Sequence, residues 1–188
     1  LQQESKPILD ILGQVLSETI ISSVDIPAFP NSAMDGYAVR QTDTIGAKEH
    51  SPKVLKVVDT LAAGQLSQQS VKEGESVRIM TGAPLPDGAD SIVPFEYTDE
   101  SDRKQSHMTM DEIGIYLEAP DNHHVRPIGG DVKKGEIVLK KGTALRPAEL
   151  GVLASLGFSR AKVHRRPVVA ILATGDELLV PGENFCPG

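Results

Sequence analysis

Short runs of alternating apolar and polar residues, broken by Gly and Pro, dominate the middle of this chain. Such runs are typical of β-strands joined by tight turns. We therefore expect strands over the following segments: Lys53–Val58, Ser76–Met80, Ser91–Glu96, Ile113–Glu118 and Glu136–Leu139. The pattern predicts a mostly β region between the two ends of the chain.

Two segments carry helical spacing instead. Between Ser5 and Ile21, apolar residues recur three or four positions apart, after a Ser that can cap and a Pro that suits a first turn. The segment Pro147–Leu156 has Pro in its first turn, and Gly157 follows its end. We expect a helix in each place.

The stretch Pro167–Ala173 is an unbroken apolar run. Such a run is typical of a strand that is buried on both faces of a parallel α/β sheet. A parallel sheet needs neighbouring strands and covering helices, and 15 residues follow Ala173. We therefore expect the chain to stop inside a domain and to be a fragment.

Composition narrows the function classes. The chain has 26 acidic and 19 basic residues, a net charge of −7, and only short basic runs, so we expect no nucleic-acid partner. The single Cys186 excludes an internal disulfide and fits a reducing, cytoplasmic setting. No apolar window is long enough to cross a bilayer and no signal segment is visible, so we expect no membrane insertion.

Two polar stretches could hold an anion or a metal. Asn31–Ala38 places the Asp35 carboxylate and the Ser32 hydroxyl beside a flexible Gly, which suits a phosphate or metal site. Arg126–Asp131 combines an Arg fork, two adjacent Gly residues and the oxygen ligands of Asp131. An ordinary polar turn is the alternative interpretation of each.

Two further stretches follow strand-like runs. Arg78–Pro86 leaves the Thr81 hydroxyl and the Gly82 N–H at a strand end, although a tight turn closed by two prolines explains the same residues. Thr174–Leu178 places two adjacent carboxylates beyond a buried strand, where ligands of open α/β sheets lie. A helix cap is the alternative there. The five His residues show no metal-ligand spacing, and we interpret them as surface residues.

Taken together and in this order, these stretches with Ala148–Gly151 resemble the MoeA/gephyrin E-domain family of molybdopterin molybdenumtransferases. The resemblance runs through nearly the whole chain and implies an α+β multidomain protein. It implies a discontinuous α/β domain with an inserted mostly β domain, followed by the first strand of a truncated molybdopterin-binding α/β domain. The implied divisions are residues 1–23 as an amino-terminal helix packed on the molybdopterin-binding domain, 24–40 with 126–166 as a linker and dimerisation domain, 41–125 as the insertion, and 167–188 as the start of the molybdopterin-binding domain.

The family reaction inserts molybdenum from molybdate into adenylylated molybdopterin and releases AMP, with Mg²⁺ or a similar divalent cation. By matching positions, the resemblance implies that Asp35, Thr81, Asp131 and Glu177 are catalytic, the three carboxylates being candidate metal ligands. It implies substrate contacts from Ser32, Met34, Gly82, Arg126, Thr174, Gly175 and Asp176. A homodimer is also implied.

Members of this family continue well beyond the point where this sequence ends, which leaves the activity of this chain alone in question. A non-catalytic, dimerising scaffold of the gephyrin type is the alternative function, with a receptor-loop peptide as its partner. An unrelated β-rich domain that binds a sugar or nucleotide is a third possibility, and the unpaired run at Pro167–Ala173 argues against it.

Overall fold

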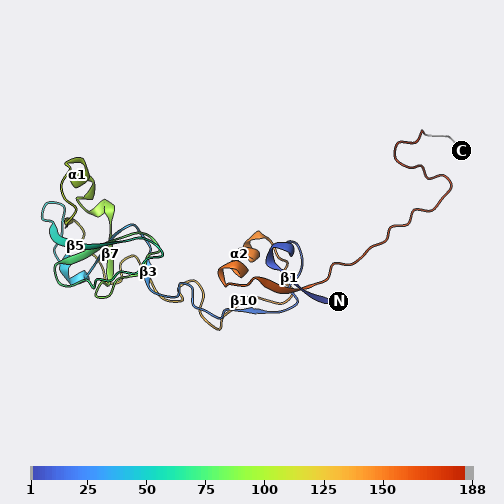
Figure 1. Ribbon diagram of the computed structural model, residues 1–188, viewed down its shortest axis with the longest axis horizontal. Coiled ribbons are helices and arrows are strands. Elements are labelled where there is room, and N and C mark those ends of the chain that lie inside the picture. Colours follow the sequence, from blue (N-terminus) through green and yellow to red (C-terminus); the bar gives the residue numbers. More distant parts are fainter. Residues whose placement is uncertain (1, 185–188) are drawn as a thin grey trace. The chain divides into compact units, whose positions relative to one another are not determined.

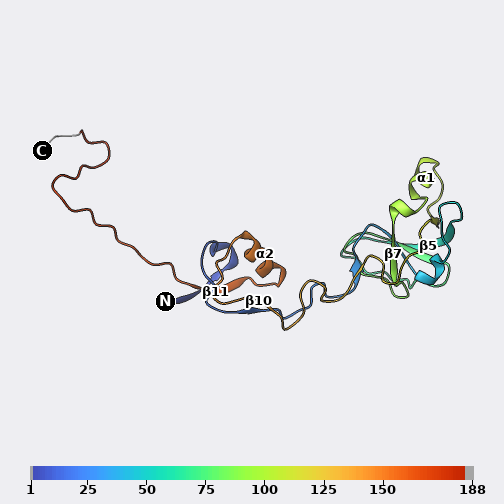
Figure 2. The ribbon, with the colours of Figure 1, turned by 180° about the vertical axis from the view of Figure 1, so that it is seen from behind.

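The computed structural model describes residues 2–184. The chain divides into two compact units, which we call unit 1 (Leu1–Thr19 and Leu139–Gly188) and unit 2 (Ile20–Val138). The structure is mixed α/β with mostly strands (Figures 1 and 2). Its elements in chain order are β1 (Gln3–Pro7), η1 (Ile8–Asp10), β2 (Ile20–Ile21), β3 (Asn31–Ser32), β4 (Gly36–Val39), η2 (Gln41–Thr44), β5 (Lys53–Leu61), β6 (Glu75–Ile79), β7 (Ser91–Pro94), η3 (Phe95–Tyr97), α1 (Glu100–Gln105), β8 (Glu112–Ile115), β9 (Val125–Arg126), β10 (Ile137–Leu139), α2 (Pro147–Ser155) and β11 (Arg160–His164).

Unit 2 is built on a five-stranded sheet in the order β7-β4-β6-β5-β8. Strand β4 runs antiparallel to both β6 and β7, while β5 pairs with β6 in parallel and with β8 in antiparallel fashion. Two smaller pairs, β2 with β10 and β3 with β9, complete the strand pairing outside unit 1. The strands predicted from alternation are confirmed, with shifted ends.

Each face of this sheet carries a buried apolar cluster. Side chains alternate between faces along a strand, so Tyr37 and Val39 pack in one apolar cluster and Ala38 in the other. In β6, Val77 and Ile79 belong to the Ala38 face, which leaves Arg78 on the Tyr37 face. Burial on both faces explains why β4 carries no polar alternation, and why its sequence predicted a loop instead of a strand.

Gly36 starts β4 where the backbone of β7 comes very close. A Cβ built on Gly36 would collide with the carbonyl oxygen of Val93 and lie 2.9 Å from the Cα of Pro94. The strand contact therefore excludes any side chain at this position.

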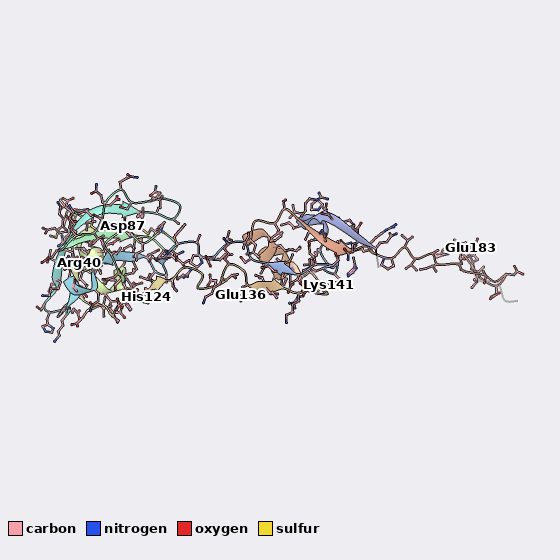
Figure 3. All side chains as sticks on the ribbon, turned by 90° about the horizontal axis from the view of Figure 1, so that it is seen from below. Arg40, Asp87, His124, Glu136, Lys141 and Glu183 are labelled. Atoms are coloured by element: carbon pink, nitrogen blue, oxygen red, sulfur yellow. The ribbon has the colours of Figure 1, made fainter. Side chains whose placement is uncertain are left out.

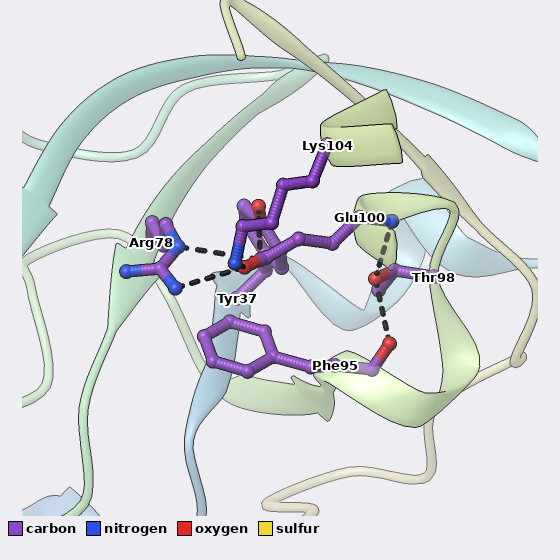
Figure 4. A network of polar contacts seen from close by, with 6 residues as sticks. All are labelled: Tyr37, Arg78, Phe95, Thr98, Glu100 and Lys104. Carbon is purple, nitrogen blue, oxygen red and sulfur yellow. Dashed lines mark hydrogen bonds and ion pairs between the residues drawn. The ribbon is translucent and has the colours of Figure 1, made fainter. Parts of the chain in front are cut away.

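Helix α1 is tied to the sheet through the buried carboxylate of Glu100 (Figure 4). Tyr37 Oη donates to Glu100 Oε2 at 2.7 Å, and Arg78 donates from Nη2 and Nε at 2.8 and 3.2 Å. Lys104 pairs with the same carboxylate. Burial raises the pKa of Glu100, but the hydrogen bonds from Arg78, Lys104 and Tyr37 outweigh this effect and lower the pKa from 4.5 to about 2.

Unit 1 has its own core, in which β1 pairs antiparallel with β11. The buried apolar side chains of this unit come from both of its chain segments and are Ile11, Leu16, Leu145, Leu153, Leu156, Ala161 and Val163. Helix α2 confirms the predicted second helix. Pro147 occupies its first turn, and the Glu149 carboxylate accepts the backbone N–H of Arg146 at 2.9 Å.

The predicted helix between Ser5 and Ile21 is wrong. Residues 3–7 pair with β11, one turn of 3₁₀ helix follows, and Gly13 has a φ of +75°, which a helix does not allow. Leu9 on the expected apolar face is 86% exposed. Pairing with a distant strand has overridden the local helical spacing.

The predicted strand over Pro167–Ala173 is also absent from the structure. Residues 165–184 form no helix or strand and are exposed. A strand of this kind needs partner strands for its backbone N–H and C=O groups, and the described part of the chain supplies none. No helix within residues 2–184 is long and apolar enough to cross a membrane. Cys186 lies outside the described residues.

The predicted boundary at residue 41 passes through unit 2. Strand β4 lies between β6 and β7 in the middle of the sheet, so residues 36–39 are part of the same compact body as the expected insertion. The other predicted divisions remain predictions.

A pair of glycine substitutions tests the strand contact. Gly36→Ala should lower the free energy of unfolding by about 1–3 kcal/mol, because the new methyl group overpacks β4 against β7. Gly151→Ala should raise it by up to about 1 kcal/mol, since nothing lies within 4 Å of a Cβ there and Ala favours the helix. Urea unfolding measures both, and equal effects of the same sign would contradict the assignment.

The Glu100 network predicts a pH dependence of stability. The folded pKa lies below the unfolded value, so the stabilisation is complete above about pH 4.5 and is lost as the pH falls from there through about 2. Glu100→Gln should cost about 2–3 kcal/mol at neutral pH, and its difference from wild type should shrink on acidification. Lys104→Ala, at a side chain that is 58% exposed, should change stability by less than about 1 kcal/mol. A pH-independent difference would contradict the account.

Candidate functional site

Asp35 and Thr81 meet at one end of the central strands of unit 2. Asp35 directly precedes β4 and Thr81 follows β6 by two residues, and because β4 and β6 are antiparallel these ends lie side by side. Both the backbone N–H and the hydroxyl of Thr81 donate to Asp35 Oδ1, each at 2.7 Å. Both residues are exposed. The structure therefore brings together two of the four residues that were expected to be catalytic.

The geometry keeps Asp35 ionised. The backbone N–H of Thr81 and then its hydroxyl lower the pKa of Asp35 below its usual value, slight burial opposes them, and the charge of Arg78 adds to the lowering. Oδ1 receives both hydrogen bonds, whereas Oδ2 accepts from none of residues 2–184. A carboxylate in this state can accept a proton or bind a cation or water through Oδ2.

Ser32 and Gly82 hold the two loops of the site together. Gly82 N–H donates to Ser32 O at 2.8 Å, and Ser32 N–H donates to Ala83 O at 3.0 Å. The Ser32 side chain is buried, and its hydroxyl donates to Met34 O at 2.5 Å. The hydroxyl and the Gly82 N–H thus serve the loop structure in this conformation. Met34, expected to contact substrate, is 37% exposed.

Arg126 and Asp131 lie in the region that follows β8. Arg126 sits in β9 opposite Asn31 and is exposed. Asp131 is exposed in the turn after the two Gly residues, where its backbone N–H donates to Ile26 O at 2.9 Å. Within residues 2–184, neither side chain is hydrogen-bonded to the Asp35–Thr81 pair.

The stretch Thr174–Glu177 belongs to unit 1 and is exposed. It forms a turn in which Leu178 N–H donates to Gly175 O at 3.2 Å. The Glu177 carboxylate folds back against Gly175, so closely that a Cβ at that glycine would collide with it. Asp176 and Glu177 therefore lie in a tight turn, and the helix that they were alternatively expected to cap is not formed.

No group of three or more His, Cys, Asp or Glu side chains that could hold a metal is found among the described residues. The rings of His123 and His124 lie 4.0 Å apart, and burial followed by the charge of His123 lowers the pKa of His124 (labelled in Figure 3).

Sequence reasoning missed the polar residues next to the pair. Tyr37 and Arg78 stand opposite each other in β4 and β6, and both are bonded to Glu100. The available signal was an Arg inside a predicted strand, with apolar neighbours on both sides. Its partner lies 22 positions away, which no local pattern reveals.

The contact between Thr81 and Asp35 predicts a measurable change in acidity. Thr81→Val removes the hydroxyl and keeps the backbone N–H, so the pKa of Asp35 should rise part of the way toward its usual value. Thr81→Ser should leave the pKa nearly unchanged. Titration of the Asp35 carboxyl carbon by NMR measures both, and an unchanged pKa in Thr81→Val would contradict the hydrogen bond.

One protein family and two relatives match most of this chain. Residues 1–157 match the family described as MoeA N-terminal region (domain I and II). The chain is 39% identical over 183 residues to a molybdopterin molybdenumtransferase of Staphylococcus aureus, covering 95% of this chain and 42% of that protein. It is 39% identical over 182 residues to molybdopterin molybdenumtransferase 2 of Mycobacterium tuberculosis, covering 97% and 43%.

A solved structure agrees with these relatives. The molybdopterin biosynthesis moeA protein from Pyrococcus horikoshii OT3 superposes with a TM-score of 0.85 at 35% identity, covering 97% of this chain and 46% of that one. The chain thus spans less than half the length of these relatives. The family match includes both halves of the Asp35–Thr81 pair, and we conclude that this chain belongs to the MoeA family through its N-terminal region.

Proposed function

We propose that this chain supplies part of the active site of a molybdopterin molybdenumtransferase, which inserts molybdenum from molybdate into adenylylated molybdopterin and releases AMP. The observation that carries the proposal is the Asp35–Thr81 pair, in which an exposed carboxylate is held ionised by two hydrogen bonds. The names of the relatives from Staphylococcus aureus and Mycobacterium tuberculosis support the reaction class.

The chemistry of the pair fits a reaction between anions. A negative carboxylate repels molybdate and phosphate oxygens, so Asp35 contributes by accepting a proton from water or by binding a cation. Thr81 fixes the carboxylate in one direction through Oδ1, which leaves Oδ2 for that purpose. We assign Asp35 to water or cation positioning and Thr81 to the orientation of Asp35.

Magnesium fits this arrangement. Mg²⁺ in proteins usually keeps several waters and binds through one or two carboxylates together with substrate phosphates. Asp35 supplies one exposed carboxylate with a free oxygen. A bound Mg²⁺ would neutralise charge on the substrate oxygens, and Asp35 and Asp131 are the candidate ligands that unit 2 supplies.

The proposal also includes the other expected site residues, the oligomeric state and the location of the protein. We propose that Asp131 and Glu177 are catalytic residues of the same reaction, and that Met34, Arg126 and the stretch Thr174–Asp176 contact substrate. We propose that Ser32 and Gly82 act by shaping the loop. The protein acts as a homodimer in the cytoplasm, with the discontinuous domain organisation that the family resemblance implies.

Substitution of the carboxylate tests the function. In the full-length protein, Asp35→Asn should lower the rate of molybdate-dependent AMP release from adenylylated molybdopterin by about a hundredfold or more, because the neutral amide neither accepts a proton nor holds a cation.

Asp111→Asn is the matched control, since Asp111 is an exposed aspartate of the same unit outside the proposed site. It should leave the rate unchanged, and both variants should unfold at the wild-type temperature. Normal AMP release by Asp35→Asn, or equal losses in the two variants, would overturn the assignment.

A further inference from the structure

The register of the sheet places Arg78 beside the Asp35–Thr81 pair. Tyr37 stands opposite Arg78 on β6 and opposite Val93 on β7, and Phe95 N–H donates to Asp35 O at 3.3 Å. Asp35 directly precedes β4 and Phe95 directly follows β7, so these two residues lie side by side where the paired strands end. The residues therefore form two adjacent rows, one with Tyr37 and Arg78 and one with Asp35 and Phe95.

The side chains of Arg78 and Phe95 meet across the two rows. Arg78 Cζ lies 4.5 Å from the centroid of the Phe95 ring, although Arg78 belongs to β6 and Phe95 follows β7. Strand β4 lies between β6 and β7, so the two side chains together bridge the face above β4. The charge of Arg78 lowers the pKa of Asp35, the residue that precedes β4.

Two nitrogens of the Arg78 guanidinium donate to Glu100, and the third has no hydrogen-bond partner among the described residues. Glu100 accepts from Nε and Nη2, at 3.2 and 2.8 Å, and the Phe95 ring lies next to the guanidinium (Figure 4). Nη1 has no hydrogen-bond partner among residues 2–184, and it is not among the buried polar atoms without a partner. Because the group is planar, fixing two nitrogens also fixes the direction of the third.

The local charge favours an anion. Glu100 shares its single negative charge between Arg78 and Lys104, so this group carries a net positive charge. The chain as a whole has a net charge of −7. Glu100 therefore does not fully neutralise the Arg78 guanidinium, which keeps positive charge for an anion.

We propose that Arg78 is an anion-binding residue of the Asp35–Thr81 site, that its Nη1 donates to an oxygen of a tetrahedral oxyanion, and that Glu100 is the positioning residue that aims it. The proposal rests on the proposed function and extends it. Molybdate and the phosphate groups of the adenylylated substrate share this chemistry, since both present charged oxygens to a planar N–H donor.

A purely structural role is the competing explanation, in which Arg78 does no more than anchor helix α1. The two explanations differ in their consequence for anion binding. An anchor can be weakened without changing the affinity for an oxyanion, whereas a binding residue cannot. Arg103 offers the matched comparison, because it is an arginine of the same helix whose Nε donates to Asp99 at 2.7 Å.

The test is an NMR titration of this 188-residue chain with sodium molybdate and, separately, sodium pyrophosphate at constant ionic strength. The side-chain Nε–H signal of Arg78 and the amide signal of Thr81 should shift saturably with at least one anion. Arg78→Lys keeps the charge but loses the fork, and should weaken that binding by about fivefold or more. Glu100→Gln should weaken it less, and Arg103→Lys should leave it unchanged.

The anion that gives saturable shifts shows whether Arg78 binds the molybdate or the phosphate groups of the substrate. Saturable shifts with molybdate alone assign Arg78 to the molybdate, and shifts with pyrophosphate alone assign it to the phosphate groups. No saturable shift of the Arg78 signal in the wild-type chain overturns the proposal, as does equal affinity in Arg78→Lys with a native amide spectrum. If a variant fails to fold, the titration of the wild-type chain still tests the proposal. Since inorganic anions need no turnover, a failure here is distinct from a failure of AMP release.

Discussion

The hydrogen bonds to the Glu100 carboxylate are the interaction on which the rest of unit 2 depends. This buried carboxylate connects Tyr37 of β4, Arg78 of β6 and Lys104 of α1 in one network. A buried carboxylate is destabilising unless its oxygens are fully paired, and here four donors serve two oxygens. The network therefore keeps β4 and β6 side by side at the level where Asp35 and Thr81 leave the sheet.

The contacts that hold unit 2 together also position the residues of the candidate site. The close approach of β7 at Gly36 fixes the start of β4, and the Thr81 N–H and hydroxyl fix the direction of the Asp35 carboxylate. Arg78 then adds a positive charge within reach of that carboxylate. A chain with an excess of acidic residues can thus attract an anion at one place, through a guanidinium and through any cation that Asp35 holds.

Local patterns predicted strands β5, β6, β7, β8 and β10 and helix α2, because alternation and helix-stop residues act over a few positions. They failed where pairing between distant segments determines the local structure. Residues 5–7 carry helical spacing but pair with β11. The polar motif before β4 predicted a loop, and its apolar continuation proved to be a strand buried on both faces. Polar stretches near strand ends singled out most candidate residues of the site, and the family resemblance assigned their roles. The contact between Asp35 and Thr81 spans 46 positions, and that between Arg78 and Glu100 spans 22, so neither could be derived from spacing.

We propose that substrate binds against the Asp35–Thr81 pair. The decisive measurement is a crystal structure of the full-length protein with adenylylated molybdopterin and molybdate. We expect phosphate or molybdate oxygens within hydrogen-bonding distance of Arg78 Nη1, with a cation or an ordered water on Asp35 Oδ2. Substrate bound elsewhere, with both atoms facing bulk solvent, would contradict it.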